Sequence, residues 1–222
     1  MGIPTQTLTT CIWCAAEPCA HELSAEQVKD QVVPLLQQAN PAAVIEVAVL
    51  ENSSAYSPSP DRLEYCLTLM APSSVAAWQQ CQNVVGLRAQ VAQWGIPVAE
   101  GGAYQLPLAQ TAKGTLFGEV VGCVDGRWQL PIHGSDRHRQ ALYRLGRQLL
   151  DALDAPVGCY FLQFSWDKGV VFDRLWPFPT VAALASVGVQ TPDWFTAYYR
   201  CLAGQPLRDL RIPDLGAVPR LE

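Results

Sequence analysis

Apolar residues in this chain are grouped in runs that have the length of a β-strand. The longest runs, residues 44–50 and 156–164, are far shorter than the roughly 20 apolar residues that a membrane-spanning helix needs. Between such runs, apolar residues recur at helical spacing, as they do at Leu142, Leu145 and Leu149. The alternation of the two patterns predicts an α+β globular fold without a membrane span.

The composition favours a folded chain and argues against some classes of partner. Half of the 222 residues are apolar and 16% are charged, so burial can offset the entropy that is lost on ordering. The net charge of −5 argues against nucleic acid as a partner, because phosphate neutralisation needs a basic surface. No signal peptide is evident, and the eight cysteines lack the density of a small secreted scaffold. We therefore expect a soluble, cytoplasmic protein with free thiols.

The first part of the chain, residues 1–105, is expected to have a ferredoxin-like fold. Its patterns predict, in order, a strand at 7–16, a helix at 24–39, strands at 43–51 and 62–70, a helix at 73–94 and a short strand at 96–99. The sequence Ser24-Ala25-Glu26-Gln27 has the form of a capping box at the start of the first helix. The order β-α-β-β-α-β is that of the ferredoxin-like split motif. The following residues, 100–114, contain two adjacent glycines and a proline and are expected to form a linker or a mobile loop.

The second part, residues 106–222, is expected to be a separate α/β unit. Its patterns predict a hairpin of strands 116–124 and 128–132, a helix at 135–153, strands at 158–166 and 170–175, and a helix at 193–202. The turn of the first hairpin is expected at Asp125-Gly126, since this dipeptide is typical of tight hairpin turns.

Three stretches of this second part resemble the C-terminal lobe of the ATP-grasp superfamily, in particular its carboxylase-type members. Residues 158–164 read GCYFLQF, residues 171–179 read VFDRLWPFP, and residues 200–207 read RCLAGQPL. The shared frame is an apolar strand, a tight turn, a second strand that ends in a proline-rich elbow, and a helix that ends in Gly-x-Pro-Leu. The match covers less than half of the chain and implies fold rather than reaction.

The resemblance implies that two metal-binding glutamates of the family are absent. Gln163 stands where the first strand of the family carries a magnesium-binding Glu, and Arg174 stands where the second strand carries another. The asparagine and arginine of the family's elbow correspond to Val181 and Phe178. Since Mg²⁺ needs anionic or strongly polar oxygens, we expect that the metal-assisted ATP chemistry is lost and that the chain is a pseudoenzyme.

A cluster at Cys11, Cys14, Cys19 and His21 has the residue types of a metal site. Zinc binds four Cys or His ligands in a tetrahedron, and an iron–sulfur cluster would need a fourth thiolate, such as that of Cys66. Cys11 and Cys14 could also form a redox pair. Residues three apart on a strand point to opposite faces, which opposes chelation. We expect no cofactor, with zinc or an iron–sulfur cluster as the alternative.

Two further groups of residues are candidates for binding. Arg137, Arg144 and Arg147 share one face of the helix at 135–153, where they could bind phosphate or an acidic partner, or could form a solvated face with Arg147 paired to Asp151. The elbow at residues 174–179 combines Arg174, Trp176 and Phe178 with two prolines. Aromatic residues and arginine are enriched at protein interfaces, so this elbow is a candidate interaction surface.

The leading functional hypothesis is a non-catalytic accessory, assembly or scaffold factor that binds another protein. One alternative is a nucleotide- or small-ligand-binding protein or enzyme with a cleft between its halves, lined by Gln163, Asp173 and Arg174. The other is a metal or redox protein built on the Cys/His cluster. In its richness in Gln, Pro, Trp and Ala, the chain resembles uncharacterised cyanobacterial proteins. The sequence indicates neither the partner nor the oligomeric state.

Overall fold

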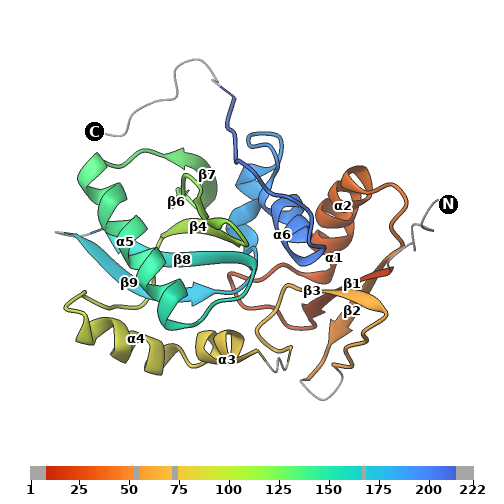
Figure 1. Ribbon diagram of the computed structural model, residues 1–222, viewed down its shortest axis with the longest axis horizontal. Coiled ribbons are helices and arrows are strands. Elements are labelled where there is room, and N and C mark those ends of the chain that lie inside the picture. Colours follow the sequence, from red (N-terminus) through yellow and green to blue (C-terminus); the bar gives the residue numbers. More distant parts are fainter. Residues whose placement is uncertain (1–8, 53–55, 72–74, 167–168, 214–222) are drawn as a thin grey trace.

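The computed structural model describes residues 9–52, 56–71, 75–166 and 169–213, which form two β-sheets with helices around them (Figure 1). A three-stranded sheet contains β1 (Thr9–Ala15), β2 (Ile45–Leu50) and β3 (Arg62–Cys66). A six-stranded sheet contains β4 (Tyr104–Thr111), β5 (Gly114–Phe117), β6 (Val120–Val124), β7 (Arg127–Ile132), β8 (Gly158–Trp166) and β9 (Val170–Trp176). No helix among the described residues is long and apolar enough to span a membrane.

The three-stranded sheet is parallel, with the order β2-β1-β3, and this corrects the expected ferredoxin-like arrangement. A ferredoxin-like sheet needs antiparallel neighbours, whereas here the chain crosses from one edge of β1 to the other between β2 and β3. The expected strand at 96–99 is reduced to a single bridge between Val98 and Phe172 of β9, so it joins the other sheet. The order β-α-β-β-α before residue 96 was predicted correctly, but strand direction depends on where each connection crosses the sheet.

Helices of the first half follow the capping signals in the sequence. The capping box at Ser24 is confirmed, and the helix it opens runs through α1 (Ala25–Gln27), a π-helical segment (Val28–Val32) and α2 (Val33–Ala39). The single helix expected at 73–94 is instead two helices, α3 (Ala76–Gln82) and α4 (Val84–Gln93), and residues 73–74 lie outside the described part. Asn83 separates them, because its side chain accepts a hydrogen bond from the backbone N–H of Gly86 and caps α4.

Strand β4 corrects the expectation of a linker at 100–114. It lies at the centre of the six-stranded sheet, whose order is β7-β6-β4-β8-β9 with β5 also paired to β4. Pro107 does not interrupt the sheet, because it lies where the neighbouring strand changes from β6 to β5. On that side its carbonyl accepts from the N–H of Gly118, and no ladder bond depends on the missing N–H.

The remaining elements agree with their sequence signals. The turn between β6 and β7 has positive φ at Asp125 (51°) and Gly126 (74°), as a tight hairpin turn requires. Ser135 caps α5 (Asp136–Ala152) and Asp193 caps α6 (Trp194–Leu202). A 3-10 helix, η3 (Val181–Ser186), follows the proline-rich elbow.

Two hydrophobic cores lie on opposite faces of the six-stranded sheet. On β8, Tyr160, Leu162 and Phe164 belong to the core under α4 and α5, whereas Cys159 and Phe161 belong to the core shared with α6 and the three-stranded sheet. This split follows from the two-residue period of a strand. Both cores combine residues from the two predicted parts, and the division at 105/106 stays a prediction.

Candidate functional site

A row of polar side chains crosses the six-stranded sheet on the face that is turned toward the N-terminal half. Gln105 of β4 is paired with Gln163 of β8, which is paired in turn with Arg174 of β9. Gln105 and Gln163 are 0% and 1% exposed. A buried amide is costly unless its hydrogen-bonding groups are satisfied, so the partners of these side chains decide what the site can do.

Both ends of the Gln163 amide are engaged. Its Nε2 donates to the backbone carbonyl of Gly102 at 2.7 Å, and its Oε1 accepts from the indole Nε1 of Trp176 at 2.8 Å. Its Nε2 also lies 3.2 Å from Nε2 of His21. Because Oε1 is occupied by Trp176, the amide faces His21 with its second N–H. The oxygen of the Gln163 side chain is therefore buried and already accepts from Trp176, so it is a poor ligand for a cation.

His21 closes the site from the N-terminal half. Its Nδ1 faces the amide of Gln105 at 3.5 Å, and its ring lies 5.5 Å from the Trp176 ring, centroid to centroid. Its carbonyl accepts from the backbone N–H of Val181 at 2.9 Å, which fixes the loop at this place. Burial and the positive charge of Arg174 lower the pKa of His21 below its ordinary value, although Asp173 partly opposes them. The imidazole is therefore neutral at neutral pH.

The lowered pKa of His21 predicts a stability that depends on pH. In the unfolded chain His21 is protonated as the pH falls through about 6.5, its ordinary pKa. In the folded chain the pKa is lower, so His21 is protonated only at a lower pH. The free energy of unfolding should therefore decrease as the pH falls from 7.5 to 5.5, by at most about 1.4 kcal/mol per pH unit for this group. Urea unfolding at several pH values measures this slope. His21→Gln should flatten it and His133→Gln, at an exposed position, should not; an equal effect of the two substitutions would contradict the assignment.

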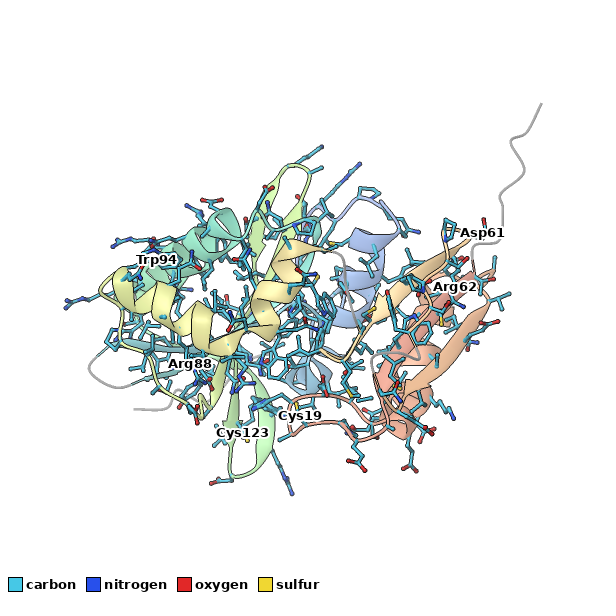
Figure 2. All side chains as sticks on the ribbon, turned by 90° about the horizontal axis from the view of Figure 1, so that it is seen from below. Cys19, Asp61, Arg62, Arg88, Trp94 and Cys123 are labelled. Carbon is cyan, nitrogen blue, oxygen red and sulfur yellow. The ribbon has the colours of Figure 1, made fainter. Side chains whose placement is uncertain are left out.

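Asp173 supplies a buried carboxylate to the site, and its side chain belongs to a residue that is 2% exposed. The guanidinium of Arg88, on α4, contacts both the carboxylate and the carbonyl of Asp173, the latter at 2.8 Å (Figure 2 labels Arg88). The backbone N–H of Gly102 donates to the carboxylate at 2.9 Å. Gly102 can approach this closely because it lacks a side chain, since a Cβ there would lie 2.7 Å from the carbonyl oxygen of Phe164. The carboxylate is thus committed to internal partners.

The elbow expected to be an interaction surface is instead part of the core. Trp176 and Phe178 are 1% and 0% exposed, because their rings fill the space between the sheet and the N-terminal half. Arg174 remains partly exposed, with its guanidinium 5.1 Å from the centre of the Trp176 ring. The aromatic side chains of the elbow therefore serve internal packing.

Several members of this site were not predicted from the sequence. They are Arg88, Gly102, Gln105 and Thr180, whose hydroxyl donates to Gln105, together with His21 in this role. His21 and Gln163 are 142 positions apart in the sequence. No local pattern connects such residues; the adjacent glycines at 101–102 were the one available signal of a close backbone approach.

The Cys/His cluster is not assembled as a metal centre. No group of three or more His, Cys, Asp or Glu residues within the described ranges could hold a metal ion, and all four candidates lie in those ranges. Cys11 and Cys14 are both buried in β1, and burial raises the pKa of Cys11 to about 11 and raises that of Cys14. Such thiols stay protonated at neutral pH, which opposes both metal binding and redox exchange. Cys19 is exposed in the loop that leads to His21.

The arginine face of α5 borders a groove between α4 and α5, with a volume of about 760 Å³. Arg144 and Arg147 line it. Arg137 lies nearer the start of the same helix and is exposed. The expected pair between Arg147 and Asp151 is absent from the ion pairs of the described residues. Arg147 instead lies over the ring of Phe117, 5.2 Å from its centre.

Comparisons with known proteins identify the fold by structure rather than by sequence. No protein family and no curated protein matches the chain. Glycinamide-RNase-transformylase T from Mycobacterium tuberculosis is similar with a TM-score of 0.60 and 15% identity, covering 90% of this chain and 80% of that one. The phosphoribosylaminoimidazole carboxylase ATPase subunit from Aquifex aeolicus has a TM-score of 0.60 and 13% identity, covering 91% and 78%. Carboxyaminoimidazole ribonucleotide synthase from Aspergillus clavatus, complexed with ATP, has a TM-score of 0.61 and 12% identity, covering 90% and 78%.

The fold is ATP-grasp-like. All three proteins are ATP-grasp enzymes, and the similarity to them extends beyond the C-terminal stretches that carried the resemblance in sequence. At identities this low, the similarity shows the ATP-grasp-like fold alone and leaves the function to the residues of the site.

Proposed function

We propose that this chain is a non-catalytic accessory factor that uses an ATP-grasp-like fold to bind another protein, in an assembly or scaffold role. The observation that carries the proposal is the buried amide of Gln163, whose oxygen accepts from Trp176 and whose N–H groups face Gly102 and His21. By the resemblance in sequence, this is the position of a magnesium-binding glutamate. A buried amide whose oxygen and N–H groups face partners inside the protein supports a structural role at this position.

The charge at the neighbouring strand supports the same proposal. Arg174 is directly paired with Gln163 across β8 and β9, at the position of the family's second metal-binding glutamate. At an effective dielectric constant of about 20, two unit charges about 4 Å apart repel each other by about 4 kcal/mol, and a divalent ion doubles that cost. Mg²⁺ would therefore meet a buried, uncharged amide that is hydrogen-bonded to Trp176, and a positive side chain.

An open ligand cleft between the halves is the less well supported alternative. Gln163 and Asp173, which were expected to line such a cleft, are 1% and 2% exposed. His21, Trp176 and Phe178 fill the junction next to them. A junction filled by apolar rings and satisfied polar groups is the expected form of a structural core.

Two measurements on the purified protein and on its natural source test this proposal. ATP with Mg²⁺ at millimolar concentration should leave the melting temperature unchanged, whereas a ligand present at 100 times its Kd would add about 2.7 kcal/mol of stability. A tagged chain should copurify with one protein reproducibly, in comparable molar amount and equally with and without nucleotide, and tagging that protein should recover this chain. Stabilisation by the nucleotide, or no reproducible partner in the reciprocal experiment, would contradict the proposal.

A further inference from the structure

We infer that the groove between α4 and α5 binds a short segment of a partner protein that carries both carboxylate and apolar side chains. This inference rests on the proposed function and names the surface and the chemistry of the partner. The groove is separate from the junction around Gln163, because α4 and α5 pack on the opposite face of the six-stranded sheet.

The groove combines positive charge with aromatic rings. Trp94, which follows α4 directly, and Gln90 line one side (Figure 2 labels Trp94). The other side is lined by residues of α5, which include Tyr143, Arg144, Arg147, Gln148 and one acid, Asp151. Trp, Tyr and Arg are the residue types in which binding energy is concentrated at protein interfaces. A guanidinium presents a planar fork of donors that matches a carboxylate.

Neither arginine of the groove forms an ion pair within the described part of the chain, although Asp151 also lines the groove. The ion pairs of the described residues engage Arg62, Arg88, Arg139, Arg174 and Arg211, whereas Arg144 and Arg147 are in none of them. Both are exposed, and the ring of Phe117 supports the guanidinium of Arg147. The two arginines outnumber the single acid of the lining, Asp151, so in a chain with a net charge of −5 the groove is a local positive site that is complementary to an acidic partner.

An apolar hollow continues the groove on the other side of Arg144 and Gln148, which border both. It has a volume of about 430 Å³, and its lining includes Ile96, Pro97 and Val171. A ligand that spans the two hollows would place apolar groups against this lining and negative groups at the arginines. That combination is found in a peptide segment with alternating acidic and apolar side chains.

The length of the groove favours a peptide over a phosphate-containing small molecule. The lining residues of α5 run from Gln140 to Ala152, which corresponds to about 18 Å along a helix at 1.5 Å per residue. Arginines can also hold phosphate, but these lie in the middle and the later turns of α5 (Asp136–Ala152), away from the backbone N–H groups of the helix N-terminus that would add to such a site. A peptide segment of several residues would extend along the whole groove.

A selection from a displayed library of random 16-residue peptides on the immobilised full chain tests the inference. We expect enriched peptides to contain both acidic and apolar residues and to bind more weakly as salt increases. Arg144→Ala combined with Arg147→Ala should reduce their affinity at least tenfold. The matched control, Arg127→Ala combined with Arg208→Ala, removes the same charge at exposed positions outside the groove and should have less than a threefold effect.

The other outcomes separate this inference from the proposed function. Three results would overturn the assignment of the groove. The selection could enrich peptides without acidic residues or enrich no peptides at all, or the groove variant could bind the enriched peptides as tightly as the wild-type chain. If the reciprocal copurification still recovers a partner from that variant, the protein-binding function stands and the surface lies elsewhere. A rise in melting temperature with ATP in the absence of Mg²⁺, lost in the groove variant, would identify a nucleotide as the occupant and would also overturn the inference.

Discussion

Replacing Asp173 by alanine should reduce the free energy of unfolding by about 3–5 kcal/mol, which is the usual cost of removing one partner of a buried ion pair. The substitution would leave the guanidinium of Arg88, whose side chain is 13% exposed, without its buried counter-charge. It would also leave the N–H of Gly102 without an acceptor. Urea unfolding of the variant and the wild-type chain, followed by tryptophan fluorescence, measures the difference.

Glu100 offers a control on the same guanidinium. Its carboxylate lies 2.7 Å from Arg88 but its side chain is 83% exposed, so the pair is screened by water. Glu100→Ala should therefore cost less than about 1 kcal/mol. Equal losses for the two substitutions would show that burial does not distinguish the two pairs and would contradict this description of the site.

The second large effect is expected for Trp176→Ala, which should destabilise the chain by about 3–5 kcal/mol, the range for truncating a buried Trp or Phe to alanine. The ring is 1% exposed and packs against His21 and Phe178. Its loss would open a cavity at the junction and leave Oε1 of Gln163 without a donor. Thermal and urea unfolding should both report the loss.

Trp176→Phe separates the hydrogen bond from the packing. Phenylalanine keeps most of the apolar contact but cannot donate to Gln163, so we expect a smaller loss of about 1–3 kcal/mol, the cost of an unsatisfied buried acceptor. Trp128→Ala, at a half-buried position in the β6–β7 hairpin, should cost less than Trp176→Ala. A phenylalanine variant as unstable as the alanine variant would assign the effect to the hydrogen bond alone.

Local signals in the sequence predicted most of the helix and strand positions. The capping box at Ser24, the Asp125-Gly126 turn and the apolar stripe of α5 act through neighbours within a few residues, so their structures follow from their own sequences. Strand β4 was missed because Pro107 is normally a sign of a loop, and its tolerance depends on strands elsewhere in the chain. The parallel direction of the three-stranded sheet was missed because it depends on how the connections cross that sheet, which no local sequence pattern contains.

The candidate site was predicted in part. Gln163, Asp173 and Arg174 were singled out, and the structure brings Gln163 and Arg174 together as a pair across two strands. Trp176 is buried because the N-terminal half packs against it. The residue pattern of β9 alone does not predict this contact. The same docking brings His21 to Gln163, and neither residue carries a local sign of the other.

The most direct test of the central claim is a calorimetric titration of ATP with excess Mg²⁺ into the purified wild-type chain. If the site of β8 and β9 is closed by the Gln163 network, the heats should equal those of dilution up to millimolar nucleotide. Saturable binding of one nucleotide per chain that requires Mg²⁺, and that persists in the variant lacking Arg144 and Arg147, would contradict the account.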